Sequence, residues 1–305
     1  MSPESATGST VTGQHAKYLV TGARGMLGSD LLEALFGRDV TVLGRADLDV
    51  TDRDAVFAAV EGHDVVVNAA AYTKVDDAES HEDDALAVNG TAAGLLGEAT
   101  ASFGAKLVQV STDYVFDGVA TSPYPEDAPI APVSAYGRTK AKGERLARAA
   151  NPDGTFIVRT AWLYGQHGPN FAKTMLKLAA DRETLSVVDD QVGQPTWTLD
   201  LAHQIVALLD SGAPAGVYHG TNSGRASWYE FAQAIFQVAG LDADRVKPTD
   251  SQAFVRPAPR PAFSVLGHDA WSRVGLAPMR LWNEALVEAA SRGVLGADDH
   301  AASSR

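Results

Sequence analysis

The chain has 305 residues, 45% of them hydrophobic and 21% charged, which is the composition of an ordinary globular protein. The absence of cysteine excludes a disulfide framework, a thiolate nucleophile and a cysteine-based zinc site. The formal net charge of -13 argues against a nucleic acid partner, because non-specific phosphate binding requires lysine and arginine.

The sequence contains no recognisable membrane span or signal peptide. No apolar run approaches the roughly 20 residues that cross a bilayer. Residues 1–16 are small and polar, without a basic start or an apolar centre, and are predicted to form a disordered leader. Residues 294–305 are predicted to form a frayed tail. We therefore expect a cytoplasmic protein without a membrane partner.

The first ordered segment is predicted to be a strand, a glycine turn and a helix. Residues 17–22 form a short β-branched run, and Gly22, Gly25 and Gly28 lead into an apolar helical pattern. This order is the context that a dinucleotide fingerprint requires, because the glycines let the backbone approach a pyrophosphate at a helix N-terminus. The spacing is GxxGxxG, not GxGxxG. A tight turn without a ligand is the alternative interpretation.

The end of the second predicted strand, 40–43, indicates which dinucleotide is bound. An acidic residue at this point binds the ribose 2′-hydroxyl of NAD, whereas an arginine accommodates the 2′-phosphate of NADP. The chain has Arg45 here, with Arg24 in the glycine turn as a second contact. We therefore expect NADPH in preference to NADH, with a solvent-facing Arg45 as the alternative.

Two further segments are candidates for the adenosine side of the cofactor. The residues that follow Arg45 either hold the adenine or only introduce the next helix. The third predicted strand, 64–68, runs into very small residues that let a flat group lie on the backbone or that simply suit a packed core. The members of these two segments that are predicted to bind the cofactor are Asp47, Leu48, Asp49, Ala69, Ala70, Ala71 and Tyr72.

The acidic stretch 76–84 is predicted to begin a helix, because carboxylates stabilise a helix N-terminus. The helix is expected to continue through 85–101. His81, Glu82 and the two aspartates after them are adjacent in sequence, so on a helix their side chains point in different directions. No metal site is predicted from them.

The residues with the clearest chemistry follow the fourth predicted strand, 106–110, which ends in Ser111 and Thr112. Ligands of open α/β sheets bind at this end of the strands. Further along, YGRTK opens a predicted helix on which Tyr136 and Lys140 lie four positions apart and share a face. A nearby ammonium favours an ionised tyrosine, so Tyr136 is a candidate for proton exchange with a carbonyl or alcohol oxygen held by Thr112. A solvated helix face is the alternative.

Strands and helices alternate over residues 17–165, which predicts a dinucleotide-binding domain with a Rossmann-type, doubly wound parallel sheet of the α/β class. Residues 166–293 are predicted to form mainly a smaller C-terminal α/β lobe that binds substrate, with some segments returning to the sheet. The lobe is expected to include a helix over 170–180. The basic stretch 255–261 either binds a diphosphate, because arginine matches phosphate oxygens, or is a surface loop.

The chain resembles the dTDP-4-dehydrorhamnose reductase family of the extended short-chain dehydrogenase/reductase superfamily. The resemblance is carried by segments in the family's order within residues 19–266, among them VTGARGMLG, DVVVNAAAYTKVDDAES, STDYVFDG, SAYGRTKAKGE, VRTAWLYG and VVDDQVGQPTWTLDLA. It implies NADPH-dependent reduction of the C4 keto group of dTDP-4-dehydro-6-deoxy-L-mannose, a dTDP-4-keto-6-deoxyhexose, to dTDP-L-rhamnose.

The resemblance also implies roles for individual residues. Thr112, Tyr136 and Lys140 match the family's catalytic residues, of which the tyrosine protonates the C4 oxygen and the lysine binds the nicotinamide ribose. The residues implied to line the pyrophosphate are Gly22, Gly25, Met26, Leu27 and Gly28, and those implied to border the substrate are Asp113, Trp162, Asn170, Gln194, Thr196 and Arg256. The family often forms dimers and sometimes uses magnesium, so we expect a monomer or homodimer. No magnesium ligand cluster is evident in the sequence.

Two alternative functions fit the same fold. One is a sugar-nucleotide epimerase or dehydratase, although the dehydratases place Asp-Glu directly after the threonine and this chain has Asp113 and Tyr114. The other is a non-catalytic NADP-binding subunit, because the regulatory subunit of methionine adenosyltransferase resembles the same reductases. Abundant alanine and arginine suggest a GC-rich bacterial genome, in which such reductases serve cell-wall rhamnose or antibiotic deoxysugars such as the dihydrostreptose of streptomycin.

Overall fold

The computed structural model describes residues 16–296. Residues 1–15 of the predicted leader and residues 297–305 of the predicted tail lie outside this range. The predicted leader is one residue too long, because Ala16 is buried in a hydrophobic core cluster. Near the other end of the described range, Val294 and Leu295 are buried in a hydrophobic cluster with residues of the lobe. The prediction that the tail begins at 294 is therefore wrong for these two residues, because their side chains complete a core.

The centre of the molecule is a six-stranded sheet with the order β10-β5-β4-β3-β1-β2, and all of its strand pairs are parallel. The chain runs from β1 to β2 on one side and then returns to place β3 on the other side of β1, so the sheet is doubly wound as predicted. Its strands are β1 (Lys17–Thr21), β2 (Asp39–Leu43), β3 (Val65–Asn68), β4 (Lys106–Thr112), β5 (Thr155–Thr160) and β10 (Gly216–His219).

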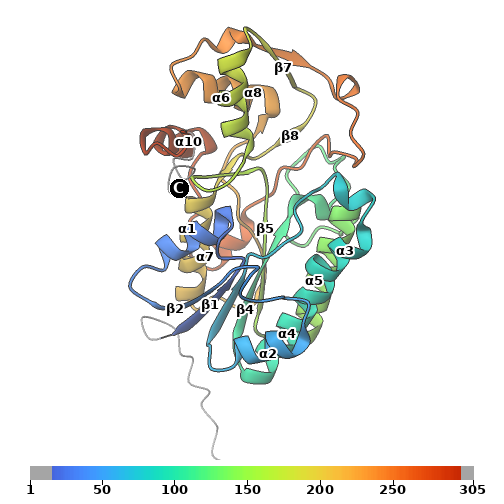
Figure 1. Ribbon diagram of the computed structural model, residues 1–305, viewed down its shortest axis with the longest axis vertical. Coiled ribbons are helices and arrows are strands. Elements are labelled where there is room, and N and C mark those ends of the chain that lie inside the picture. The colour runs from blue at the N-terminus through green and yellow to red at the C-terminus, as the bar shows by residue number, and fades with distance from the viewer. Residues whose placement is uncertain (1–15, 297–305) are drawn as a thin grey trace, which may run out of the picture.

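Helices cover both faces of the sheet, which explains why a strand such as β3 (VVVN) is buried throughout. α1 (Met26–Ala34) packs with α7 (Thr198–Asp210) on one face. On the other face lie α2 (Arg53–Val60), α4 (Ala92–Phe103) and α5 (Ala135–Ala150), as Figure 1 shows. The order of these layers is that of a Rossmann-type domain.

The helix predicted over 85–101 is interrupted in the structure. A 3-10 turn, η1 (Asp77–Glu79), comes first, and α3 (Glu82–Leu86) then runs through a π turn, η2 (Ala87–Thr91), into α4. Asn89 lies in the π turn and bonds to the backbone of Tyr72 after β3, through its Oδ1 at 2.9 Å and its Nδ2 at 3.1 Å. The π turn therefore places an amide against the predicted cofactor segment.

The upper lobe in Figure 1 has a second hydrophobic core, in which Trp197, Phe231 and Phe236 are buried. It contains α6 (Phe171–Asp181), α8 (Trp228–Val238) and α10 (Trp282–Ser291). Three strand pairs complete it, namely β6 (Leu163–Tyr164) with β9 (Thr196–Trp197), β7 (Leu185–Val188) with β12 (Val246–Thr249), and β8 (Val192–Gly193) with β11 (Ala226–Ser227).

Not all of residues 166–293 belong to this lobe. The strand β10 joins the central sheet beside β5, and α7 packs in the sheet layer with α1. The short helix α9 (Asp269–Arg273) also contacts β10, and the Trp271 Nε1–H donates to the His219 carbonyl at 2.7 Å. The chain therefore crosses between the two layers several times. None of the helices in residues 16–296 combines the length and the apolar character that crossing a membrane requires.

Candidate active site

The start of α5 lies against the end of β4, and this contact brings the predicted catalytic residues together. Ser134 caps α5 by accepting a hydrogen bond from the Gly137 N–H at 3.1 Å, and the Ala135 N–H donates to Glu79 Oε1 at 2.8 Å. The 3-10 turn η3 (Asp113–Val115) follows β4, and a Cβ on Gly137 would lie 2.2 Å from the Tyr114 carbonyl oxygen. Only glycine permits so close an approach.

Thr112, Tyr136 and Lys140 occupy this junction. The half-buried Tyr136 ring packs edge-on to the Tyr114 ring, with centroids 5.6 Å apart. The Thr112 hydroxyl donates to Asp113 Oδ1 at 2.9 Å, and the Lys140 ammonium donates to the Val110 carbonyl at 2.6 Å. The lysine is only 4% exposed, so its charge is held inside the protein next to β4.

Burial controls the protonation of these groups. It raises the pKa of Tyr136 to about 12, and the Asp113 carboxylate acts in the same direction while a hydrogen bond with Thr112 opposes it. Burial lowers the pKa of Lys140 to about 8, against the attraction of Glu144. The expectation that a nearby ammonium lowers the Tyr136 pKa is therefore wrong for this structure, because the largest effect on this pKa is burial, which raises it. At neutral pH Tyr136 is a protonated phenol.

Asp113 is a second buried acid at the same place. It is 2% exposed, and its Oδ2 has no hydrogen-bond partner within residues 16–296. Burial raises the pKa of Asp113 to about 6, and the hydrogen bonds that it accepts oppose this shift. The Ser264 hydroxyl is the strongest of the groups that oppose this shift, and it too has no hydrogen-bond partner within residues 16–296, so it lies close enough to compete with a ligand for the Asp113 carboxylate.

The predicted cofactor loop forms a tight turn at the N-terminus of α1. Gly22 has a φ of 65°, and a Cβ there would lie 2.5 Å from the Ala70 backbone nitrogen, so glycine is needed where the loop meets the segment after β3. Gly25 is the N-cap of α1 and offers no side-chain cap to the N–H groups of the first turn. That first turn contains the predicted residues Met26, Leu27 and Gly28.

The predicted cofactor residues differ in whether their side chains are available to a ligand. Arg45 is exposed, whereas Asp47 accepts hydrogen bonds from the Gly44 N–H at 2.9 Å and from the Arg24 guanidinium at 3.2 Å. Ala69, Ala70, Ala71 and Tyr72 line the half-buried segment after β3. By contrast, the side chains of Leu27 and Leu48 pack in hydrophobic clusters, and Asp49 bonds to Thr51. A cofactor contact from either leucine has to come from its backbone.

Of the predicted substrate residues, Trp162 and Asn170 lie where the lobe meets the sheet layer. Trp162 stacks on Trp228 with ring centroids 3.6 Å apart, and it is the one non-glycine residue of 16–296 with a positive φ, of 48°. Asn170 caps α6 and donates to the Gly165 carbonyl at 3.0 Å. The positive φ of Trp162 is a strained backbone conformation, and such strain concentrates at functional sites.

Gln194 and Thr196 are placed differently. Gln194 Oε1 accepts from the Leu266 N–H at 2.8 Å and from the Thr221 hydroxyl at 2.9 Å, while its Nε2 donates to the Leu266 carbonyl at 3.3 Å. The Thr196 hydroxyl donates to the Gln194 carbonyl at 3.1 Å, and both side chains are buried. These bonds tie the lobe loop to the strand segment at Leu266 and leave little capacity for a ligand.

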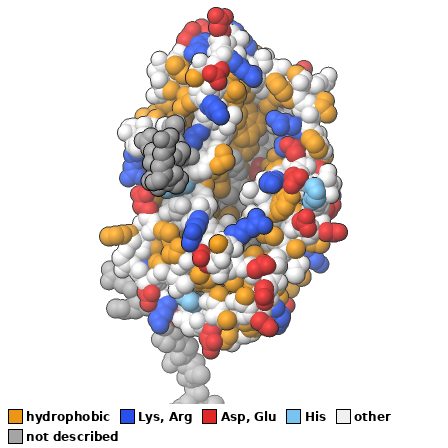
Figure 2. Space-filling view, in the orientation of Figure 1, with side chains coloured by type: hydrophobic (Ala, Val, Ile, Leu, Met, Phe, Trp, Pro, Cys, Tyr) orange, Lys and Arg blue, Asp and Glu red, His pale blue; other side chains and the backbone are white. Residues whose placement is uncertain are grey.

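The basic stretch 255–261 is anchored to the opposite side of the site by Asp76. The Arg260 Nη2 lies 2.9 Å from Asp76 Oδ1, and the Arg256 Nη1 lies 3.7 Å from Asp76 Oδ2. The Arg260 guanidinium also lies 6.0 Å from the centroid of the Tyr114 ring, which contacts Tyr136. Figure 2 shows a hollow in this face of the molecule with lysine and arginine side chains at its rim. Sequence reasoning names the stretches that contain Asp76 and Arg260 but misses the ion pair between them, because no local pattern relates residues so far apart.

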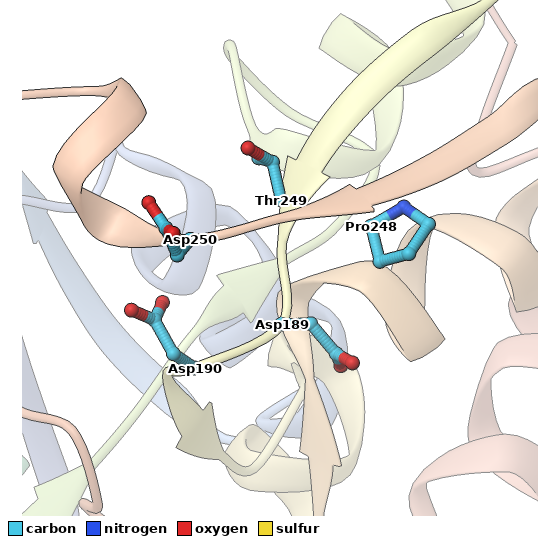
Figure 3. Close-up of a pocket in the computed structure, with 5 residues that line it drawn as sticks. All are labelled: Asp189, Asp190, Pro248, Thr249 and Asp250. Carbon is cyan, nitrogen blue, oxygen red and sulfur yellow. The ribbon is translucent and has the colours of Figure 1, made fainter.

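A separate acidic pocket lies in the lobe at the ends of β7 and β12 (Figure 3). Asp189, Asp190 and Asp250 line it, but each already accepts hydrogen bonds, from Ser227, Ser251 and Gln252 respectively. No predicted site residue lines this pocket. Across residues 16–296, no group of three or more acidic or histidine side chains is arranged to hold a metal ion.

Comparison with known proteins gives the family. The family described as RmlD substrate binding domain matches residues 16–294. A dTDP-4-dehydrorhamnose reductase of Streptomyces griseus is 51% identical over 280 residues, covering 89% of this chain and 92% of that protein. A dTDP-4-keto-6-deoxy-D-glucose reductase of Streptomyces niveus is 50% identical over 277 residues, covering 90% of this chain and 96% of that protein.

A solved structure agrees with these relatives. The dTDP-4-dehydrorhamnose reductase of Bacillus anthracis, in complex with NADP, superposes with a TM-score of 0.88 at 38% identity, over 91% of this chain and 99% of that chain. The predicted Rossmann-type fold and the predicted resemblance are both confirmed. The chain belongs to the dTDP-4-dehydrorhamnose reductase family.

Proposed function

We propose that this protein reduces the C4 keto group of dTDP-4-dehydro-6-deoxy-L-mannose to dTDP-L-rhamnose with NADPH, or carries out the equivalent reduction in the biosynthesis of an antibiotic deoxysugar. The observation that carries the proposal is the junction of β4 and α5, at which Thr112 ends the strand and Tyr136 and Lys140 lie in the first turns of the helix, with Lys140 bonded to β4. The relatives support it, since they are named reductases of 4-keto sugar nucleotides.

The glycine turn fits the pyrophosphate of a dinucleotide. The uncapped N–H groups at the start of α1 suit an anion, and the close approach of Gly22 to Ala70 lets the loop pass beside the cofactor segment. Arg45 is exposed at the end of β2 and is our candidate for binding the 2′-phosphate. When bound, the reduced nicotinamide supplies a hydride to the C4 carbon.

Tyr136 is our candidate for the proton donor. Its raised pKa keeps the phenol protonated at neutral pH, and this is the form that reduction of a carbonyl group requires. We expect the Thr112 hydroxyl, which donates to Asp113 Oδ1 in this structure, to turn toward the substrate and donate to the C4 oxygen instead, which holds that oxygen beside the phenol. A Lys140 ammonium at this point stabilises the tyrosinate that remains after the proton has left.

The substrate side follows from the surrounding residues. We propose that Asp113, with its free Oδ2, accepts a hydrogen bond from a sugar hydroxyl, and that Trp162 and Asn170 border the hexose. The Arg256 side chain is 60% exposed beside its ion pair with Asp76, and we propose that it contacts the diphosphate. The saturated bonds of Gln194 and Thr196 favour a supporting role for these two residues.

The test is a turnover assay with NADPH and dTDP-4-dehydro-6-deoxy-L-mannose, in which the product is identified by NMR. Oxidation of NADPH with formation of dTDP-L-rhamnose supports the proposal. A different 4-keto sugar reduced in its place would keep the chemistry and change the pathway. Tight NADPH binding without oxidation by any such sugar would contradict the proposal and favour a non-catalytic subunit. Light scattering of the same sample distinguishes the monomer from the homodimer.

A further inference from the structure

A buried ion pair lies directly behind the proposed catalytic residues. The Arg159 Nε donates to Glu144 Oε1 at 2.9 Å and its Nη2 donates to Glu144 Oε2 at 2.8 Å, so the pair is bidentate. Both side chains are only 3% exposed. Glu144 comes from α5 and Arg159 from β5, so the ion pair joins the helix to the sheet (Figure 1).

Glu144 also bonds to β4 and lies near Lys140 on α5. Its Oε1 accepts a hydrogen bond from the Ser111 hydroxyl at 2.5 Å, and Ser111 immediately precedes Thr112 in β4. Along α5, Glu144 follows Lys140 by one helical turn, so both lie on the buried face. One carboxylate thus contacts the strand that carries Thr112 and neighbours the lysine on the helix that carries Tyr136.

Packing alone does not explain an ion pair at this position. Removing two charges from water has a desolvation free energy that their attraction often fails to offset. A well-packed apolar pair at the same place is therefore often equally or more stabilising than a buried ion pair. Each nitrogen of the Arg159 guanidinium has a partner, because Nη1 also donates to the Glu126 carbonyl at 3.2 Å and lies 3.4 Å from His219 Nε2. An arrangement this specific fixes where the carboxylate lies.

The charges around Lys140 give the carboxylate an electrostatic effect. From α5, Glu144 raises the pKa of Lys140 against the effect of burial, which lowers it to about 8. Arg159 faces Glu144 from β5, and Asp113 faces Tyr136 from η3. From β10, His219 faces Arg159, and burial lowers the pKa of this histidine to about 3, so it is uncharged across the neutral range.

We propose that Glu144, held by Arg159 and Ser111, is a positioning residue that sets Thr112 against α5 and keeps the neighbouring Lys140 in its charged form. The inference rests on the proposed reductase function. It assigns to Glu144 no contact with substrate or cofactor. It makes the buried ion pair part of the site and gives it a measurable effect on the pH dependence of the reaction.

The test compares three variants by kcat, KM and the pH profile of kcat/KM. The basic limb of the profile, where activity falls as pH rises, is expected to report the loss of the proton from Lys140. Glu144→Gln keeps the shape of the side chain but leaves Arg159 as an unbalanced cation, so this limb moves to lower pH by about one unit. We also expect kcat to fall by a larger factor than KM changes. Glu144→Asp keeps the charge, so it lowers kcat while the basic limb stays in place. Ser111→Ala removes only the bond to β4 and also lowers kcat without moving the basic limb.

Glu82→Gln is the matched control. Glu82, on α3, forms a bidentate ion pair with Arg138, which lies on α5 as Glu144 does. Both of these side chains are more than 40% exposed, and Ser111 bonds to neither. We expect its kinetics and pH profile to equal those of the wild type. A Glu144→Gln enzyme that is merely less stable, with an unchanged basic limb and kcat, overturns the inference.

Two further readouts keep the test decisive. If Glu144→Gln does not fold, the inference requires that Glu144→Asp and Ser111→Ala both lower kcat, and wild-type values for both overturn it. The pH dependence of the NADPH dissociation constant is measured by fluorescence for wild type and Glu144→Gln, without any sugar. A wild type that binds NADPH but reduces no keto sugar refutes the proposed function, while a shifted binding profile in the variant still supports the link between Glu144 and Lys140.

Discussion

Gly137→Ala tests whether the contact between α5 and η3 sets the geometry of the site. The new Cβ would lie 2.2 Å from the Tyr114 carbonyl oxygen. A carbon–oxygen contact normally needs about 3.3 Å, so the start of α5 has to move by about 1 Å relative to β4. Because Tyr136 precedes this residue and Thr112 ends β4, the displacement opens the site, and errors of about 1 Å in positioning cost about 10²-fold in rate.

Stability changes much less in this variant. Overpacking costs about 1–3 kcal/mol, but alanine is favoured over glycine in a helix by about 1 kcal/mol. We therefore expect a folded protein with kcat about 10²-fold lower, measured with the keto sugar and NADPH beside thermal unfolding. Gly216→Ala is the control, because its nearest atom would be 3.8 Å away. A folded Gly137→Ala enzyme with wild-type kcat would show that this contact does not set the catalytic geometry.

Three further outcomes are expected. Tyr136→Phe should keep the wild-type affinity for NADPH in a fluorescence titration but lose about 10²–10⁴-fold in kcat, and near-normal turnover would remove Tyr136 from the mechanism. Arg45→Asp should shift the ratio of kcat/KM for NADPH and NADH toward NADH, whereas an unchanged ratio would mean that Arg45 does not contact the 2′-phosphate. Burial raises the Asp113 pKa from its usual 3.8 to about 6, so the folded state holds this proton more tightly and wild-type stability is lost as pH rises from about 4 to about 6. Asp113→Asn should lack this loss, which amounts to about 3 kcal/mol in denaturant titrations at the two pH values, and parallel stability curves for the two proteins would contradict the assignment.

The parts of the site that the sequence predicts are those set by local periodicity. Tyr136 and Lys140 share a face because they are four residues apart on a helix, and Thr112 follows a buried strand. The strand, glycine turn and helix at the start of the chain are likewise predicted, because their order can be read from consecutive residues. These features require no knowledge of what packs against them.

The remaining features depend on residues that are distant in sequence. The YGRTK segment alone predicts a lowered Tyr136 pKa, whereas the burial that raises this pKa comes from the assembled fold. Asp76 and Arg260 meet only after the lobe has been built. The resemblance implies that Gln194 borders the substrate, and the pairing of its amide with the backbone of Leu266 has no signal in the sequence. Two-residue strands such as β8 and β9 have no periodicity from which a pairing can be predicted.

The return of the chain to the sheet at β10 has a consequence for biosynthesis. β10 covers the edge of β5, and the segment that separates these strands builds α6 and several strands of the lobe. Because chains emerge from the ribosome N-terminus first, β5 remains an open edge until the residues of β10 have been translated. Open edges invite pairing with other chains. A fragment that ends at residue 165 would keep this edge permanently, so we expect it to aggregate, whereas a fragment that extends through α9 retains both β10 and the helix that packs on it.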